Sequence, residues 1–461
     1  MSSQDKPTPV KKTPPEGTAP RTKLWTALTE RVHDHRTLIH FSTASVAFNL
    51  TTMLANIIIL RWIGPADMGL WQLLLLIQSY SLVVQCGVFN GLNRELPFRM
   101  GTGDDNAVKE FAGTTQSVAI GGGIILLIGG LGSLLFIDDT TKRYTTAIVF
   151  LCSAENLYVN YLAVTYRADK AFRTLTWLRV FQAAVTLLTL PLVCYFGFAG
   201  LIGRYLLITT AAMSLNHAWR PIHVRPSFIW QRALTLLKVG VPVYILGYIV
   251  TVADTFPQVL LSGSGTKMVG LFSPVSATIT MMQMLPVSIA QYIYPHMSYR
   301  FGKTGDPATL WPIAWKTSVG LLVLLLPVLL IGIALIPWVL RAYFPQYADA
   351  AGAVKFGLMS GMFLGASISM TALFSLKAWF WAGVYSVGRA VSTYVLLLLM
   401  IWCWTSRLEA VAAGYMLAQA FAFALAMFCI YRATHPKKPI SIPPSAEMEK
   451  EPEISGPYNA S

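Results

Sequence analysis

The sequence predicts an all-α polytopic membrane protein with about twelve transmembrane helices in two pseudo-symmetric six-helix bundles. Of its 461 residues, 54% are hydrophobic and only 12% are charged, whereas a soluble domain carries about 25% charged residues. The apolar residues occur in long runs, each near the roughly 20 residues that cross a bilayer. The two halves of the chain also share a weak internal repeat. These observations together define the fold class.

The apolar runs locate the expected spanning helices. Backbone that faces lipid has to be helical, because no other local structure there satisfies its hydrogen bonds. We expect helices at residues 38–60, 68–92, 114–137, 145–166, 175–197, 199–217, 239–261, 269–297, 313–337, 351–376, 378–404 and 408–432.

The polar segments between and beyond these runs set the domain boundaries. Residues 1–37 and 433–461 are rich in proline and charge, which predicts disordered tails, the first ending in a short interfacial helix. The expected lobes are 38–217 and 239–432, joined by a linker with an amphipathic helix at 218–238.

The distribution of Lys and Arg predicts the orientation. If the N-terminus is cytoplasmic, only six of the 35 basic residues fall in outside loops. This positive-inside bias, with an even number of helices, places both termini in the cytoplasm. The six are Arg61, Lys142, Arg143, Lys267, Arg341 and Arg407.

Composition and motifs argue against several other classes. The net charge of +14 lies in short gaps between apolar runs, so we expect no nucleic-acid partner. The five cysteines lie inside apolar runs without metal-ligand spacing, and no cofactor or metal is expected. The chain holds no HExxH, GxSxG or Walker-type motif, and the loops between helices are too short for a sugar-transferase site. We therefore expect a protein that is not an enzyme.

The internal repeat has an offset of 201 residues. Gly64, Gly69 and Leu70 correspond to Gly265, Gly270 and Leu271, and Arg99, Gly101 and Asp105 correspond to Arg300, Gly302 and Asp306. Six helices separate the copies, so the repeat is parallel. Two such bundles with a cavity between them are a transporter design.

Three ionisable residues lie deep in expected helices. Arg389, Glu155 and Asp254 fall in the eleventh, fourth and seventh helices, where a charge costs roughly 2.5–3.5 kcal/mol on insertion scales and usually faces a cavity or a partner. Each could line a cavity or belong to a structural pair between packed helices. Because a guanidinium suits phosphate oxygens, the deep Arg389 favours an anionic, phosphate-bearing cargo.

Other polar residues within the spans are more ambiguous. Arg179 and Arg204 lie about one turn from helix ends, where snorkelling is an alternative to cavity lining. Asn156 lies beside Glu155. Uncharged side chains could bind sugar hydroxyls, although interhelical hydrogen bonding is the default; they are Asn49, Asn56, Gln85, Asn90, Gln283 and Gln291.

One stretch of the first half resembles a known family. Residues 60–105 supply Arg61, Gly64, Pro65 and Gly69, followed by Gly91, Leu92, Arg94 and Pro97. This pattern resembles the first-to-second helix region of the polysaccharide transporter (Wzx-like oligosaccharide flippase) family of the multidrug/oligosaccharidyl-lipid/polysaccharide (MOP) superfamily. The segments 237–243 and 343–357 are also similar to family segments.

The resemblance implies a MOP/MATE-like fold in a bacterial inner membrane. It implies alternating access that turns an undecaprenyl-pyrophosphate-linked oligosaccharide from the cytoplasmic to the outer leaflet, for O-antigen, exopolysaccharide or capsule. A proton or sodium ion would drive transport, and a polysaccharide polymerase and glycosyltransferases would be partners, besides bilayer lipids.

Site residues can be transferred from the family by position only. Arg389, Arg179 and Arg204 are expected at the pyrophosphate, and Glu155 and Asp254 at the coupling ion. Asn49 lies where other branches of the superfamily carry an ionisable group, which puts proton coupling through the first helix in doubt. Asn156 is a further cavity-lining candidate.

Three alternatives remain open from the sequence. A cation-coupled multidrug (MATE-type) exporter would need acidic groups and aromatics in its lumen. A membrane-embedded transferase would need a catalytic cluster in a polar loop, and the seven histidines form none. A scaffold without transport activity would leave the buried charges without a role.

Overall fold

The computed structural model describes residues 20–435, with side chains from residue 40 onward except at 291, 292, 294, 295 and 302. Most of the expected tails, 1–19 and 436–461, and the side chain of Gln291 lie outside this part. The first half folds into α1 (Pro20–Ile59), α2 (Pro65–Ser81), η1 (Leu82–Gln85), α3 (Val88–Thr102), α4 (Asp105–Phe136), α5 (Thr140–Ala168), α6 (Phe172–Leu188) and α7 (Leu190–Ala218).

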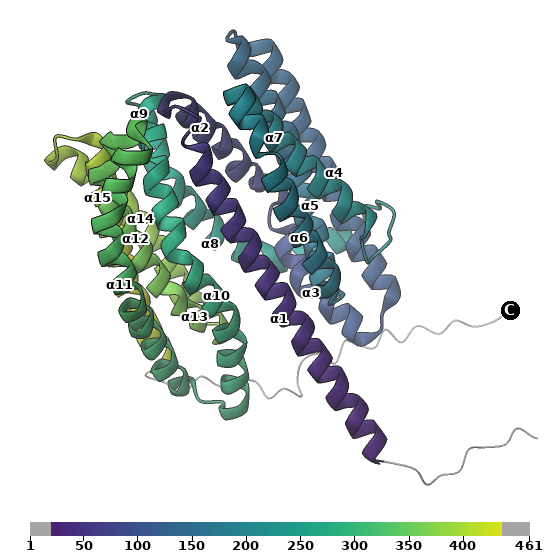
Figure 1. Ribbon diagram of the computed structural model, residues 1–461. Coiled ribbons are helices and arrows are strands. Elements are labelled where there is room, and N and C mark those ends of the chain that lie inside the picture. Colours follow the sequence, from purple (N-terminus) through teal and green to yellow (C-terminus); the bar gives the residue numbers. More distant parts are fainter. Residues whose placement is uncertain (1–19, 436–461) are drawn as a thin grey trace, which may run out of the picture.

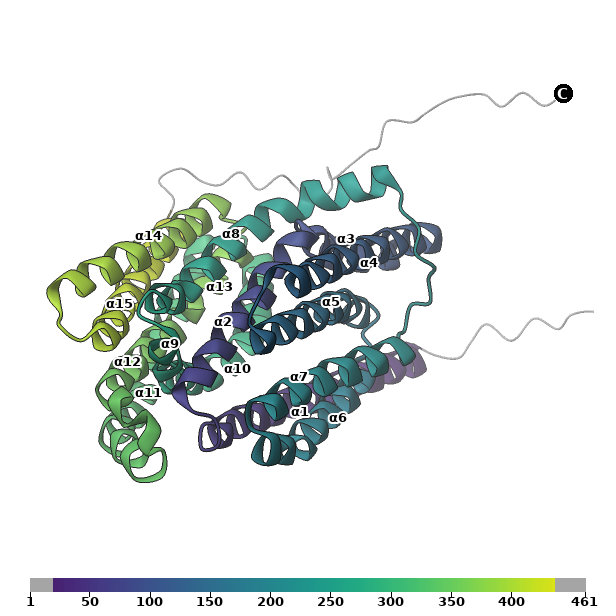
Figure 2. The same cartoon turned by 90° about the horizontal axis from the view of Figure 1, so that it is seen from above.

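The second half is also helical. It contains α8 (Trp230–Ser262), α9 (Thr266–Leu271), α10 (Ser273–Thr304), η2 (Pro307–Leu310), α11 (Trp311–Tyr343), η3 (Pro345–Ala350), α12 (Ala351–Ala366), η4 (Ser367–Met370), α13 (Thr371–Ser375), α14 (Trp379–Cys403) and α15 (Arg407–Thr434). Figures 1 and 2 show α4 to α7 on one side of the molecule and α11, α12, α14 and α15 on the other, with α2, α8 and α10 between them.

The helices confirm the all-α membrane fold. Eleven helices of the described part are long and apolar enough to cross a bilayer. The 17-residue α6 is not among them, because α6 ends before Pro191 and the chain continues as α7. Gly197 in α7 has φ +54° and ψ −128°, and an added Cβ on Gly200 would overlap the carbonyl of Leu192. The chain therefore folds back at Gly197, so that residues 172–196 and 198–218 run side by side.

Two expected boundaries differ in the structure. The expected interfacial helix and first span form one continuous helix, α1. The expected amphipathic helix of the linker is likewise the beginning of α8, and only residues 219–229 connect α7 to it without helix. No proline or glycine interrupts α1 after Pro20, and α8 stays helical through Gly240 and Pro242, so both helices continue beyond the apolar run.

The expected second span, 68–92, is broken. Cys86 (φ 46°) and Gly87 (φ 84°) adopt left-handed backbone between η1 and α3. The break lets α3 lie against α8, where an added Cβ on Gly91 would overlap the backbone of Leu236 and one on Gly240 would overlap Gly87. Sequence hydropathy cannot reveal this break, since both sides of it are apolar.

The internal repeat forms the contact between the halves. An added Cβ on Gly69 would overlap the carbonyl oxygen of Thr266, and one on Gly270 would overlap that of Pro65. Both pairs, 69/270 and 65/266, differ by 201, so α2 and α9 meet as equivalent surfaces across a local two-fold axis, as in an isologous contact. We call this contact the glycine seam.

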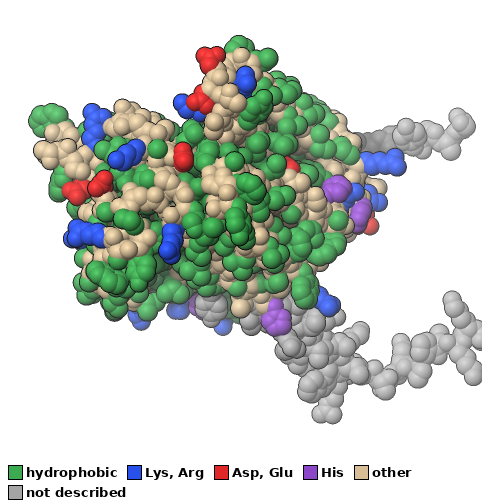
Figure 3. Space-filling model, turned by 45° about the horizontal axis from the view of Figure 1, so that its top comes forward, with side chains coloured by type: hydrophobic (Ala, Val, Ile, Leu, Met, Phe, Trp, Pro, Cys, Tyr) green, Lys and Arg blue, Asp and Glu red, His purple; other side chains and the backbone are tan. Residues whose placement is uncertain are grey.

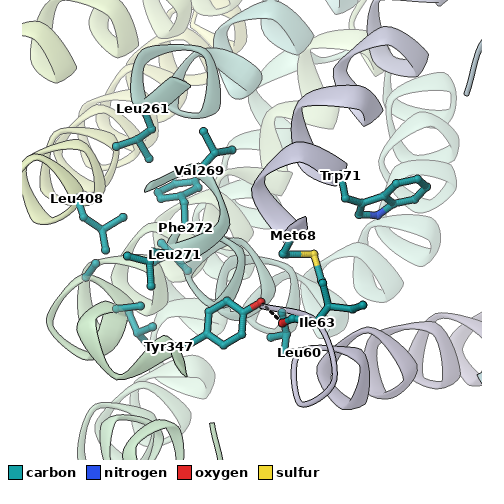
Figure 4. Packing of buried hydrophobic residues seen from close by; sticks show 14 of the residues in the cluster. Leu60, Ile63, Met68, Trp71, Leu261, Val269, Leu271, Phe272, Tyr347 and Leu408 are labelled. Atoms are coloured by element: carbon teal, nitrogen blue, oxygen red, sulfur yellow. Dashed lines mark hydrogen bonds between the residues drawn. The ribbon is translucent and has the colours of Figure 1, made fainter. Parts of the chain in front are cut away.

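Apolar packing surrounds the glycine seam. Met68 and Trp71 on α2 and Val269 and Phe272 near α9 belong to one buried cluster (Figure 4). Tyr347 lies in the same cluster and donates a hydrogen bond to the carbonyl of Ile63 at 2.9 Å.

The second repeat motif aligns one residue differently from the sequence match. Gly103 (φ 73°) ends α3 and Asp104 caps α4, accepting from Ala107 N–H at 3.0 Å. Gly305 (φ 65°) ends α10 and Asp306 caps η2. The structural offset here is 202, so Asp104, rather than Asp105, corresponds to Asp306.

The outer surface suits a lipid environment. Hydrophobic side chains cover most of the face in Figure 3, and charged side chains lie mainly towards its edges. Large apolar side chains on α4 and α11 are more than half exposed, among them Ile128, Leu135, Val323 and Ile331. Exposure of this kind is costly in water and favourable against acyl chains.

Candidate functional site

The deep charges of the second half form one cluster. Arg389 on α14 donates from Nη2 to Asp254 Oδ1 on α8 at 2.6 Å, and the hydroxyl of Tyr415 on α15 donates to the same oxygen at 3.1 Å. The Arg389 side chain is 8% exposed and that of Asp254 is 35% exposed. We call these three residues the ion-pair cluster. Its carboxylate neutralises the guanidinium, so Arg389 is not an isolated cation.

The deep carboxylate of the first half has a different environment. Glu155 on α5 is buried, and its Oε1 accepts from the hydroxyl of Thr210 on α7 at 2.7 Å. Its Oε2 is buried without a hydrogen-bond partner in the described part of the chain. Asn156 does not join it, because its amide donates to the Cys152 carbonyl at 2.8 Å within the same helix. Glu155 thus has one lone carboxylate oxygen available to a proton or cation.

A second polar pair lies on the same helix as Thr210. Tyr205 on α7 donates to Gln78 Oε1 on α2, and its ring packs edge-on against Trp71 at 5.0 Å. We call Glu155, Thr210, Tyr205 and Gln78 the N-lobe polar set. Tyr205 and Gln78 are not among the residues predicted from the sequence. Only the position of each polar side chain inside an apolar run could have indicated them.

Arg204 and Arg179 lie apart from the ion-pair cluster. Arg204 on α7 is buried and donates from Nη2 to the Thr186 carbonyl at 3.3 Å, which ties α7 to the end of α6. Arg179 on α6 is half-buried, donates to Gln182 at 3.1 Å and places its guanidinium 5.2 Å from the centre of the Phe48 ring on α1.

A cavity of about 370 Å³ lies between α1 of the first half and α10 of the second. Three of the amides that the sequence suggested for sugar hydroxyls, Asn49, Asn56 and Gln283, meet there. Thr52 and Thr280 add hydroxyls, and Phe48 links the cavity to Arg179. Among the described residues that line it, none is a carboxylate. We call this space the amide cavity.

Hydrogen bonds between α2 and α8 connect the halves beside this region. Tyr80 and Thr255 hydroxyls are 2.7 Å apart, and Gln258 donates to Gln72 at 3.4 Å. Thr255 follows Asp254 directly in α8, so the ion-pair cluster is one residue from a contact between the halves. Within residues 40–435, no group of three His, Cys, Asp or Glu side chains is placed to hold a metal.

The fold is similar to that of several solved structures. A MATE family multidrug resistance transporter of the MOP superfamily in an inward-facing conformation matches with TM-score 0.66 and 14% identity over 85% of this chain and 98% of its own. The outward-facing conformation of such a transporter matches with TM-score 0.64 and 14% identity, over 88% and 97%.

A third solved structure of similar fold comes from an archaeal MOP superfamily transporter. A Pyrococcus furiosus MOP superfamily transporter, described as having a binding pocket of reverse polarity that suggests a different function, matches with TM-score 0.59 and 12% identity over 87% and 97%. No protein-family model and no curated protein sequence matches the chain. Its fold is that of the MATE and other MOP superfamily transporters.

Proposed function

We propose that the chain is an alternating-access transporter that turns a pyrophosphate-linked oligosaccharide on an undecaprenyl lipid from the cytoplasmic to the outer leaflet of a bacterial inner membrane. The product would serve synthesis of a surface polysaccharide. Both termini would be cytoplasmic, and a polymerase and glycosyltransferases would act on either side of this step.

The amide cavity is the observation that carries the proposal. Amide and hydroxyl groups both donate and accept hydrogen bonds, which matches the hydroxyls of a sugar. A cationic drug would instead favour carboxylates, and none is among the described residues of this cavity. Its place between α1 and α10 supports a cargo site that both halves share.

The position of Arg179 supports a cargo that carries a phosphate group. It lies against Phe48, one of the cavity residues, and within the described part of the chain no carboxylate pairs with it. A guanidinium at the edge of an amide-lined cavity fits a ligand with phosphate oxygens beside sugar rings. Arg389, whose charge Asp254 neutralises, would then position helices.

The glycine seam supports an alternating-access movement of the two halves. The halves are in backbone contact at α2 and α9, while α1 and α10, which also meet, line the amide cavity between them. Transporters built from two such bundles change access by rocking the bundles about the site between them. Access to the amide cavity would alternate as the two halves rock about the glycine seam.

Removal of cavity amides tests the proposal. In cells whose surface polymer depends on this protein, Asn56→Leu with Gln283→Leu should reduce polymer at least about tenfold, since each lost hydrogen bond costs about 1 kcal/mol. Asn160→Leu, at an exposed amide on α5, is the matched control and should leave polymer unchanged. Normal polymer in the double variant, at equal protein in the membrane, would contradict the proposal.

A cation-coupled multidrug exporter is the second candidate. The half-satisfied carboxylate of Glu155 favours it, because a buried acid with a free oxygen can exchange a proton for a cation. The double variant together with Glu155→Gln separates the two candidates: for an exporter, drug efflux should be lost in Glu155→Gln and survive loss of the cavity amides.

A further inference from the structure

A second, larger cavity lies within the first half, away from the contact between the halves. It is an open pocket of about 800 Å³ between α4, α5, α7 and the linker 219–229. Its polar lining residues are Gln116, Tyr158, Ser214, His217, Arg220 and Arg225. We call it the linker cavity.

The polar side chains of the linker cavity form a connected chain. Gln116 is 5% exposed and its amide donates to the Tyr158 hydroxyl at 3.3 Å. That hydroxyl lies 2.8 Å from His217 Nδ1, and Arg220 Nη1 lies 2.9 Å from the same nitrogen. Gln116 Oε1 and Arg220 Nε remain buried without partners.

The charge of this chain is uncompensated. His217 offers a lone pair to Arg220 but no negative charge. Within the described residues, no carboxylate lies within ion-pair distance of Arg220 or Arg225. Because a partly buried cation without a counter-charge is costly, the cavity has the chemistry of an anion site.

The position of the linker cavity indicates the kind of anion. The span that contains α7 ends at Ala218, so His217 and Arg220 lie where the chain leaves the hydrocarbon region. Basic pockets between transmembrane helices at this depth suit anionic headgroups. Arginine forks and hydroxyl donors match phosphate oxygens.

From this geometry we propose that the linker cavity binds a phosphate ester of net negative charge, with Arg220 and Arg225 as the charged donors and Ser214 as a hydroxyl donor. The source is either the headgroup of an anionic phospholipid or a soluble phosphate ester. The linker is also hydrogen-bonded to α4, from Ser227 N–H to the Gly113 carbonyl at 3.3 Å. A bound phosphate would therefore hold the linker against the first half of the molecule.

Native mass spectrometry of the purified full chain tests the proposal. Phosphatidylglycerol should remain bound with at least about tenfold higher affinity than phosphatidylcholine, and Arg220→Gln should lower that affinity about tenfold, as expected for one charge-assisted hydrogen bond. Arg300→Gln, at an exposed arginine of α10, is the matched control and should have no effect. Ser214→Phe should also weaken binding, because it removes a hydroxyl donor and places a bulky ring among the donors; this second variant covers the case in which Arg220→Gln fails to fold.

A second arm separates the sources. If glycerol 3-phosphate displaces phosphatidylglycerol at equal concentration, the site recognises the phosphate group and also binds soluble phosphate esters. If it does not, the site takes the lipid, and either result supports a phosphate site. Equal retention of the two phospholipids together with no binding of glycerol 3-phosphate would overturn the proposal, as would wild-type affinity in both Arg220→Gln and Ser214→Phe.

Discussion

The two halves of the molecule share their contact surface but not their buried charges. At the glycine seam, Gly69 and Gly270 approach each other's helix in the same way. Deeper in the lobes, the second half holds a compensated pair, Asp254 and Arg389, whereas the first holds Glu155 with one oxygen unpartnered. The repeat has thus kept the surface that both halves need to meet, and the charged positions have diverged.

The difference suggests different roles. A paired buried charge is expensive to break and fixes how helices pack. A buried carboxylate with one unpartnered oxygen can still contact a transported ion, so we expect it to act in coupling. We therefore expect the ion-pair cluster to govern stability and the N-lobe polar set to govern transport.

The largest expected effect on stability is at Asp254. Asp254→Asn leaves Arg389 buried without a counter-charge and should lower the free energy of unfolding by about 3 kcal/mol, the lower end for buried pairs because the Asp254 side chain is 35% exposed. Thermal unfolding in detergent, followed by tryptophan fluorescence, measures the loss.

The double variant sharpens that result. Asp254→Asn with Arg389→Met removes both charges and should recover most of the lost stability. If the double variant is as unstable as the single one, the pair does not act as a compensated unit.

The glycine seam should respond equally from either half. Gly69→Ala and Gly270→Ala each place a methyl group against a carbonyl oxygen of the other helix, which should cost about 1–3 kcal/mol and slow transport to a similar extent. The two effects should not add, because both act at one contact. Gly132→Ala, on α4 with open space around it, is the control and should change neither stability nor transport. Clearly different losses of stability in Gly69→Ala and Gly270→Ala would contradict the proposed symmetry of the seam.

The smallest expected effect on stability is at Glu155. Glu155→Gln keeps an acceptor for Thr210 and should change the free energy of unfolding by less than about 1 kcal/mol. Transport in proteoliposomes should nevertheless lose its dependence on an imposed proton or sodium gradient. A variant that responds to either gradient like the wild type would remove Glu155 from coupling.

The sequence predicts most of the helices, because hydropathy is a local signal, and it reveals the repeat of Gly69 and Gly270. That these glycines form the contact between the halves is a long-range feature that the repeat alone does not give. It places Asp254 and Arg389 at depth, but they are 135 residues apart, and nothing in their spacing predicts that they pair. The break at Cys86 and Gly87 is hidden inside an apolar run. That Asn49, Asn56 and Gln283 share one cavity depends on how α1 and α10 approach, which packing alone decides.

Transport by the purified protein in proteoliposomes tests the central proposal most directly. The glycolipid would be incorporated into the vesicle membrane and its movement between leaflets followed, and in separate vesicles a cationic dye would be loaded into the lumen and its release followed. We predict that the glycolipid crosses, that crossing fails in Asn56→Leu with Gln283→Leu, and that the dye stays inside. Dye movement that requires Glu155, with no glycolipid crossing, would contradict the assignment and favour a drug exporter.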